Sequence, residues 1–370
     1  MKNQYRLYAW QKSFFAGKLR AYLNYKGVDY QGKTINAYDM KVTLPKKIGA
    51  SAMPALETRE GEWLSDTPEI IAELEKRHPT RPIMPPSPRQ AIAALLFENW
   101  VDDSWLVIAI HTRWSYAENY DSLLREEGGK NLLPFAPRFI RNRVVDKAFA
   151  GRIRSYMPSQ GITGQQIPLI ERWSVGLLDL LETHFAQQPY LFGNKPCIAD
   201  YGLVGAFYGH LNRDPWPKRE WLDPRPHCQS WTERTHRGDR ATGEWLGDDK
   251  IPSTLQPLLE IIFKEFFPML EKTTRALRDY IDQRQLKPGD SLPRTMGGIS
   301  FPMADDEFTR STFTYTLWRM QRIQAFYRSL PSDDQDSAAR WFTEMGQPDF
   351  LSMDFGPALE RNSLSTRLAS

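Results

Sequence analysis

The fold is decided by the stretch Met53-Pro54-Ala55-Leu56-Glu57 and, after a short gap, Trp63-Leu64-Ser65-Asp66-Thr67-Pro68-Glu69-Ile70-Ile71. The first run predicts a strand that opens at a proline, because proline has no backbone N–H for a sheet and is found at strand starts and edges. The second run predicts a strand that passes directly into a helix, with Thr67 as the capping residue and Pro68 in the first helical position. The backbone amides of a helix start attract anions. If the Met53-Pro54 bond is cis, the stretch predicts a site for a small anionic peptide.

The residues before this stretch predict a strand, a helix and a second strand. Tyr5–Ala9 has the alternation of a short strand, and apolar residues at helical spacing follow over residues 15–23. Gly27 is placed to end that helix, since glycine is the usual residue after a helical C-terminus. Val28–Ile35 alternates again, and the two strands are expected to be parallel. Residues 36–52 look irregular.

The chain from residue 54 onward completes an α/β domain over residues 1–80. Strands at Ala55–Thr58 and Trp63–Ser65 are expected to pair as an antiparallel hairpin, and a helix is expected over Pro68–Arg77. Residues 81–88 are rich in proline and predict a stiff linker.

Three further segments follow the linker. Residues 89–240 carry apolar residues at helical spacing over several long runs, which predicts an all-helical domain. Residues 241–353 predict a mostly helical extension, with a long helix over Leu255–Ile281 and a small hairpin within Leu292–Pro302. Residues 354–370 are polar and are expected to form a flexible tail.

Composition excludes several classes of function. The 370-residue chain has a formal net charge of only +3, so no global field favours nucleic acid or an anionic membrane. Charged residues and prolines interrupt the apolar run over residues 255–270, which predicts an amphipathic helix and no membrane span. Two cysteines, Cys197 and Cys228, form no CxxC pair. With no apolar leader at the start, these features predict a cytoplasmic protein.

The sequence offers few residues for chemistry other than those around a small anionic ligand. Ser13 stands at the entry to the first helix, where its hydroxyl and the helix amides favour an anion such as a thiolate, although a plain capping serine explains it equally. Asp66 and Thr67 stand at the start of the next helix, where they either simply cap it or bind a ligand, with the helix amides on a carboxylate and Asp66 on an ammonium group. Lys46 and Lys47 offer a cation for a carboxylate or form a solvated loop pair. No phosphate-binding loop, HExxH or GxSxG motif is present, and no metal is expected.

Taken together, these motifs resemble the glutathione S-transferase family over about residues 4–240. The first helix, the Met53-Pro54 strand and the Asp66-Thr67 helix start are similar to the thioredoxin-like N-terminal domain of that family. The segment Leu191-Phe192-Gly193-Asn194-Lys195-Pro196-Cys197-Ile198-Ala199-Asp200 is similar to a capping-box segment of its helical domain. The resemblance implies an α/β thioredoxin-like N-terminal domain followed by an all-α glutathione S-transferase C-terminal domain with a mostly helical extension.

The resemblance also implies a ligand and a reaction. Glutathione would be the co-substrate, with no metal: Ser13 would bind its sulfur, Met53 and Pro54 the cysteinyl unit, Asp66 and Thr67 the γ-glutamyl end, and Lys46 or Lys47 the glycine carboxylate. A small electrophile would be the second partner, and a homodimer and no nucleic-acid partner are expected. Five aromatic residues could line the apolar pocket or simply form core: Trp10, Phe14, Trp105, Trp114 and Tyr116.

Four departures from the family pattern keep a second function open. Phe14 stands where a proline is common, Ala16 where a second serine is common, Asp66-Thr67 replaces Glu-Ser, and Cys197 replaces a Ser or Thr cap. Residues after 240 match no part of the ordinary family. The alternative to a glutathione-dependent enzyme is therefore a non-catalytic binding or assembly module of the same fold.

Overall fold

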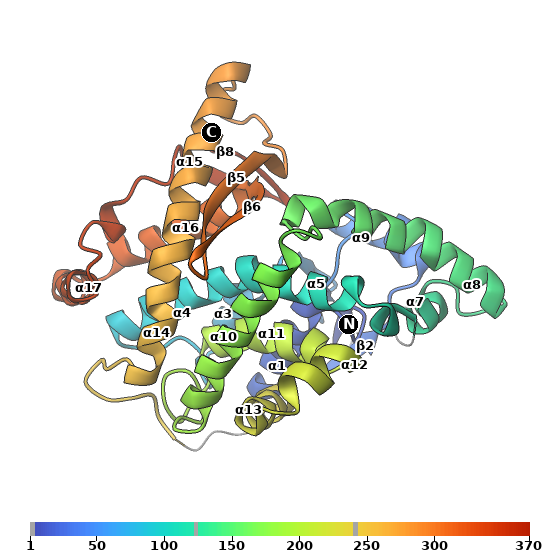
Figure 1. Ribbon diagram of the computed structural model, residues 1–370, viewed down its shortest axis with the longest axis horizontal. Helices are drawn as coiled ribbons and strands as arrows, with labels where there is room; N and C mark the ends of the chain where they lie inside the picture. The colour runs from blue at the N-terminus through green and yellow to red at the C-terminus, as the bar shows by residue number, and fades with distance from the viewer. Residues whose placement is uncertain (1–3, 122–124, 240–242) are drawn as a thin grey trace. The chain divides into compact units, whose positions relative to one another are not determined.

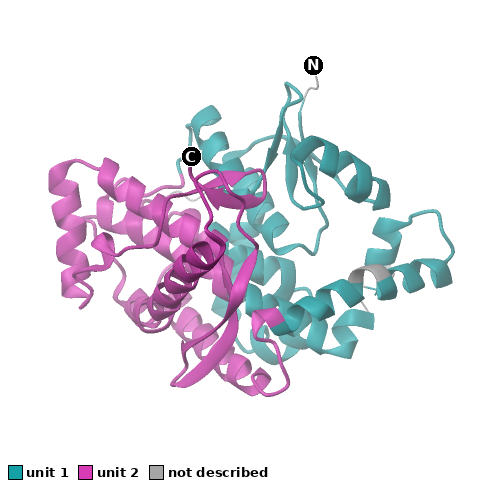
Figure 2. Cartoon of the chain, turned by 90° about the horizontal axis from the view of Figure 1, so that it is seen from above, with its two compact units in different colours: residues 1–82, 105–158, 201–240 teal, residues 83–104, 159–200, 241–370 magenta. Residues whose placement is uncertain are grey.

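The computed structural model describes residues 4–121, 125–239 and 243–370. The chain groups into two compact units (Figure 2). Unit 1 comprises residues 1–82, 105–158 and 201–240, and unit 2 comprises residues 83–104, 159–200 and 241–370. The domain boundaries expected at residues 80, 88 and 353 stay predictions, and the one at Arg240 lies outside the described residues.

Unit 1 begins with a small mixed sheet of four strands in the order β2-β1-β3-β4. The strands are β1 (Tyr5–Tyr8), β2 (Tyr30–Lys33), β3 (Ala55–Glu57) and β4 (Trp63–Ser65). β1 is parallel to β2 and antiparallel to β3, and β3 is antiparallel to β4. The parallel pair and the antiparallel hairpin both agree with the sequence predictions.

Two helices of this domain pack together. α1 (Phe14–Lys26) ends at Gly27, whose φ of 69° is the left-handed conformation expected of a glycine cap. α3 (Thr67–Arg77) buries Ile70 and Leu74 completely. The Tyr22 hydroxyl of α1 donates a hydrogen bond of 2.8 Å to the Glu75 carboxylate of α3. α1 and α3 are thus joined by a polar contact beside a buried apolar face.

Two local predictions in this domain are wrong. Residues 36–52 are not irregular, because a helical turn over residues 39–43 continues into α2 (Leu44–Ile48). Thr67 is not the capping residue of α3 but its first helical residue, and Asp66 is the cap. The φ of 68° at Asp66 takes the chain out of β4, so the helix begins one residue earlier than capping chemistry alone suggests.

The rest of unit 1 is helical (Figure 1). Its helices are α5 (Leu106–Ser115), α6 (Ala117–Asn119), α7 (Arg125–Leu132), α8 (Arg138–Val144), α9 (Gly151–Tyr156), most of α11 (Ile198–Ala206), α12 (Pro215–Pro217) and α13 (Pro226–Arg237). Short π-helical or 3₁₀ turns continue several of them, as at residues 207–211 after α11.

Unit 2 contains six helices and two antiparallel hairpins among the described residues. Its helices are α4 (Pro88–Trp100), α10 (Ile167–Phe185), α14 (Gln256–Ile261), α15 (Phe267–Arg284), α16 (Thr314–Ser329) and α17 (Ser332–Glu344). One hairpin joins β5 (Thr295–Met303) to β6 (Asp306–Phe313), and the other joins β7 (Leu359–Asn362) to β8 (Ser365–Leu368). The small mixed sheet of unit 1 and the mostly helical remainder confirm the predicted fold class.

Buried ion pairs tie the extension into unit 2. The Arg319 guanidinium of α16 contacts the carboxylates of Glu98 and Asp102, and Arg310 of β6 contacts that of Asp103. All five side chains are at most 7% exposed. Breaking a buried pair is costly, so these contacts hold residues 241–370 to the end of α4 and the turn after it.

The structure corrects two predictions near the C-terminus. The hairpin expected within Leu292–Pro302 instead spans residues 295–313, because its turn lies at Ala304-Asp305, whose φ values of 47° and 62° suit a tight two-residue turn. The expected flexible tail instead forms β7 and β8, because Leu359 and Leu368 pair across the hairpin and are both buried.

None of the helices in the described ranges meets the length and hydropathy needed to cross a bilayer. The same ranges contain no group of three or more His, Cys, Asp or Glu side chains arranged to hold a metal ion.

Candidate functional site

Strand register brings the predicted site residues to one edge of the sheet in unit 1. Tyr8, the last residue of β1, pairs with Ala55, the first residue of β3, and Ala55 pairs in turn with Ser65, the last residue of β4. Tyr8 also pairs with Lys33, the last residue of β2. The segments that follow β1, β2 and β4 and the segment that precedes β3 therefore all begin or end at the same edge of the sheet. These segments contain all the predicted ligand-binding residues, namely Ser13, Lys46, Lys47, Met53, Pro54, Asp66 and Thr67.

Ser13 is the N-cap of α1. Its hydroxyl oxygen accepts a hydrogen bond of 3.4 Å from the Ala16 amide, and its carbonyl accepts one of 2.8 Å from the Gly17 amide. The side chain is partly exposed. The Ser13 hydroxyl therefore caps α1 through a long hydrogen bond at the positive end of the α1 dipole, and its role toward an anion stays a prediction.

Asp66 and Thr67 form the start of the second helix at this edge. The φ of 68° at Asp66 is unusual for a residue with a side chain, and such conformations cluster at ligand clamps and active sites. The Asp66 carbonyl accepts the Ile70 amide at 2.9 Å, which begins the helical ladder, while Thr67 is 3% exposed. Two helix N-termini thus flank the same sheet edge, a favourable place for negative charge.

Met53 offers backbone groups at this edge. The Met53-Pro54 bond is cis. Among the residues that the structure describes, the backbone N–H and C=O of Met53 have no hydrogen-bond partner. Unpaired main-chain groups next to a strand can pair with an extended peptide.

Lys46 and Lys47 are exposed on α2. The Lys47 ammonium lies 5.9 Å from the centre of the Trp63 ring, which is within the range of a cation–π contact. The two lysines place positive charge on a short helix between β2 and β3, and Lys47 also contacts the Trp63 ring.

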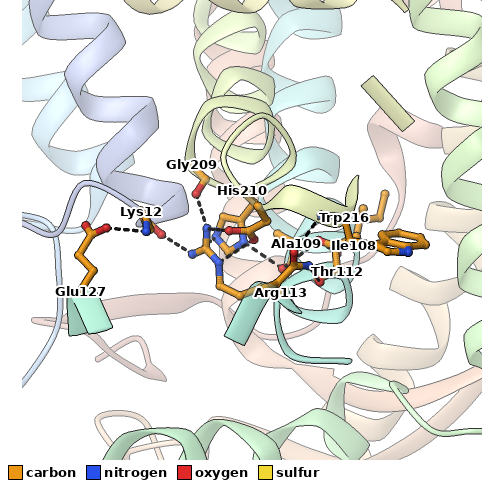
Figure 3. A network of polar contacts seen from close by, with 11 residues as sticks. Lys12, Ile108, Ala109, Thr112, Arg113, Glu127, Gly209, His210 and Trp216 are labelled. Atoms are coloured by element: carbon orange, nitrogen blue, oxygen red, sulfur yellow. Dashed lines mark hydrogen bonds and ion pairs between the residues drawn. The ribbon is translucent and has the colours of Figure 1, made fainter. Parts of the chain in front are cut away.

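A buried arginine holds the loop that leads to Ser13 (Figure 3). The Arg113 guanidinium of α5 forms a bidentate pair with Asp214, with N–O distances of 2.8 and 3.1 Å, and the two side chains are 5% and 0% exposed. Its remaining N–H groups donate to the carbonyl oxygens of Lys12 and Gly209 and to His210 Nε2. The backbone immediately before Ser13 is therefore fixed by a charge pair from the helical part of unit 1.

The hydrogen bonds of His210 show which ring nitrogen carries the proton. His210 Nδ1 lies 2.9 Å from the Ala109 carbonyl, which requires an N–H at Nδ1 and leaves Nε2 to accept from Arg113 at 3.3 Å. Burial lowers the pKa of His210 well below its usual range, and the Arg113 charge lowers it further. The imidazole is therefore neutral, and it links the Ala109 carbonyl to Arg113 through its two ring nitrogens.

Two glycines allow the end of α11 and the helical turn that continues it to approach the start of α1. A Cβ on Gly205 would lie 2.8 Å from the Phe14 carbonyl oxygen, and one on Gly209 would lie 3.0 Å from the Ser13 carbonyl oxygen. Four residues apart, the two glycines share one helical face. They set the distance between this helix and the N-terminus of α1.

The aromatic candidates for a substrate pocket are mostly core. Trp10, Phe14, Trp105 and Trp114 are at most 9% exposed, and only Tyr116 is partly exposed. Each has a partner inside unit 1: the Trp10 indole donates to the Ile35 carbonyl at 2.7 Å, and the other rings pack against neighbouring rings. Their role in binding an electrophile stays a prediction.

Sequence analysis missed the Arg113 network. Asp214 lies among many charged residues that form exposed pairs, such as Lys218–Asp223, yet Asp214 itself is fully buried. A signal was present in α5, where Arg113 is the one full charge in an otherwise apolar helix. A lone charge on such a helix predicts a buried partner, although the sequence does not say which.

The capping-box segment of unit 2 keeps its aspartate. Asp200 accepts hydrogen bonds from the Cys197 amide at 2.9 Å and from the Leu191 amide at 3.1 Å. Cys197 itself is fully buried, and burial raises the pKa of its thiol well above the usual range. A fully buried thiol of this kind is a poor nucleophile, so Cys197 is a buried residue at a helix entry.

Comparison with known protein families identifies both halves of the predicted arrangement. Residues 7–82 match the family model "Glutathione S-transferase, N-terminal domain", and residues 175–234 match "Glutathione S-transferase, C-terminal domain". These two stretches of the chain therefore match the N- and C-terminal domains of the glutathione S-transferases. The sheet edge described above lies within the glutathione S-transferase N-terminal domain, and the segment from Leu191 to Asp200 lies within the C-terminal one.

Individual relatives are more distant. The chain is 26% identical to Metaxin-1 of Sus scrofa over 168 residues, which is 43% of this chain and 50% of that protein. It thus spans about half the length of this curated relative. Among solved structures, it is similar to a glutathione S-transferase from Methylobacterium radiotolerans in complex with glutathione sulfonate (19% identity, 68% of this chain, 100% of that chain, TM-score 0.40). It is also similar to a beta-etherase from Sphingobium sp. strain SYK-6 (17% identity, 62% and 94%, TM-score 0.42).

Proposed function

We propose that the protein binds glutathione at the sheet edge of its N-terminal domain and activates the glutathione thiol for attack on a small electrophile. One observation carries the proposal: strand register brings Ser13, Met53 and the Asp66-Thr67 helix start to the same edge. The family matches of both domains support glutathione as the ligand.

Each group at the edge suits one part of glutathione. The unpaired backbone of Met53 would pair with the cysteinyl unit as an added strand does. The backbone amide of Thr67 would bind the γ-glutamyl carboxylate, and the Asp66 carboxylate would bind the γ-glutamyl ammonium group. Lys46 or Lys47 would take the glycine carboxylate, and Ser13 the sulfur.

The reaction follows from the electrostatics of Ser13. A hydroxyl donor and a helix N-terminus favour the thiolate over the thiol, so the thiol releases its proton to solvent more readily. The sulfur then forms a bond to the electrophilic carbon, and the leaving group departs with its electron pair. Placing both substrates side by side supplies much of the acceleration. The electrophile and the expected homodimer stay predictions.

A direct binding test uses the full chain in calorimetric titration with glutathione. Asp66→Asn is expected to weaken binding about tenfold, because it removes a charged partner of the ligand ammonium. Asp29→Asn is a matched control: Asp29 is exposed and stands before β2, at the opposite edge of the sheet. Absence of glutathione binding by the unaltered chain would refute the proposal.

A conjugation assay with chlorodinitrobenzene tests catalysis. Ser13→Ala is expected to lower the rate about tenfold or more, since it removes a hydrogen bond to a charged sulfur. Ser155→Ala, an exposed serine of α9, is the control. Glutathione binding without any turnover would favour the alternative, a non-catalytic binding or assembly module. An unchanged rate in Ser13→Ala would show that the thiolate is stabilised by other groups.

A further inference from the structure

Exposed apolar residues lie on the loop between α7 and α8 and on the first turn of α8. Figure 1 shows these elements at its right. Phe135 is 99% exposed, Phe139 is 74% exposed and Ile140 is 40% exposed. Pro134 and Pro137 flank Phe135 in the connecting loop. Burying a phenylalanine is strongly favourable, so a cluster of this kind on a folded surface marks a place of interaction.

Positive charge surrounds the same cluster. Residues 131–145 contain three arginines and no Asp or Glu. On α8, Arg143 lies four residues after Phe139, which places the two side chains on one helical face. Arg138 and Arg143 are both exposed, as is Lys147 one turn further on. Cationic and apolar side chains therefore share one surface.

Two neighbouring carboxylates, those of Asp146 and Glu127, have partners outside this surface. Asp146 contacts the Tyr120 hydroxyl and forms an ion pair of 3.1 Å with Arg125. Glu127 of α7 forms an ion pair of 2.5 Å with Lys12. The positive charge of α8 is local, since the whole chain carries only +3.

We propose that the surface formed by Phe135, Phe139, Ile140, Arg143 and Lys147 docks on an anionic phospholipid bilayer. Interfacial helices of this kind insert aromatic and aliphatic side chains at the level of the headgroups, while arginine and lysine attract anionic lipid. Charge complementarity selects an anionic surface over a neutral one. The binding is peripheral and adds a function to the proposed glutathione chemistry without depending on it.

The test is flotation of the full-length protein with vesicles of phosphatidylcholine that contain phosphatidylserine, compared with phosphatidylcholine alone. The unaltered protein is expected to float with the anionic vesicles, less at raised salt, and not with the neutral ones. Phe135→Ser with Phe139→Ser is expected to weaken binding about a hundredfold, roughly tenfold for each ring. Arg143→Gln with Lys147→Gln is expected to weaken it by roughly fivefold for each charge.

A matched control replaces an exposed aromatic residue and an exposed cation elsewhere in unit 1. Tyr38 is 67% exposed and Lys41 is also exposed, so Tyr38→Ser with Lys41→Gln should leave vesicle binding unchanged. The proposal is overturned if the unaltered protein ignores anionic vesicles, binds neutral ones equally, or keeps its affinity in the phenylalanine variant. It is also overturned if that variant converts a dimer into a monomer on a sizing column, because a second copy of the chain would then cover the surface.

Discussion

Replacing Asp214 by alanine is expected to destabilise unit 1 by about 3–5 kcal/mol, because it leaves the Arg113 guanidinium buried without a counter-charge. The two side chains are 0% and 5% exposed and share two hydrogen bonds of 2.8 and 3.1 Å. The other acceptors of Arg113 are neutral: the carbonyl oxygens of Lys12 and Gly209, and His210. None of them compensates a full charge.

Urea unfolding, followed by tryptophan fluorescence, measures this loss. The control is Glu118→Ala, which breaks the pair of Glu118 with Arg219, two side chains 43% and 54% exposed. Such a surface pair is worth about 0–1 kcal/mol. A double variant, Arg113→Met with Asp214→Leu, should lose less stability than Asp214→Ala alone, because it leaves no buried charge unpaired.

The same variant should also loosen the loop before Ser13. Hydrogen exchange of residues 9–17 is expected to speed up in Asp214→Ala and to stay unchanged in Glu118→Ala, because Arg113 fixes the Lys12 carbonyl. The reasoning is refuted if Asp214→Ala costs no more stability than Glu118→Ala, or if the double variant loses as much stability as Asp214→Ala alone.

Three further outcomes are expected. Gly205→Ala should lower the unfolding temperature and weaken glutathione binding, because the new Cβ would lie 2.8 Å from the Phe14 carbonyl oxygen. Differential scanning calorimetry measures the first effect, and calorimetric titration with glutathione measures the second. The thiols of Cys197 and Cys228 are both 0% exposed, so they should react with a chromogenic disulfide reagent only after the chain is unfolded in urea. Rapid reaction of either thiol in native buffer would contradict this. Burial lowers the pKa of His236 to about 3, below its usual 6.5, so the folded state binds fewer protons than the unfolded one and stability should fall as the pH drops from 6.5 towards 3. His236→Phe should reduce the loss measured by urea unfolding between pH 6.5 and pH 5, and an equal loss in both proteins would exclude this histidine as a cause.

Much of the N-terminal domain can be predicted from the sequence, because its signals are local. Ser13 and Gly27 bracket α1 through capping chemistry that acts within one turn of helix. The strand at Trp63–Ser65 follows from its own residues, as does the helix that begins beside it. Only the exact cap differs, since the backbone at Asp66 adopts a conformation that composition does not reveal.

The C-terminal region shows the limit of the same reasoning. The polar residues after 354 predict a tail, yet β7 and β8 form because Leu359 and Leu368 are paired and buried. Burial of a residue depends on what the rest of the chain places against it. A local pattern of a few apolar residues among polar ones does not carry that information.

The sequence by itself predicted the two glutathione S-transferase domains that the family models match, because capping, turn and proline signals lie within a few residues of one another. The residues that it assigns to glutathione stay a prediction. Only the tertiary structure decided that Tyr8, Ala55 and Ser65 lie in one row and so bring those residues to a single edge. It also decided that Arg113 meets Asp214, 101 positions later in the chain, beside the Ser13 loop. Pairing between distant segments is set by register and burial, which no short stretch of sequence encodes.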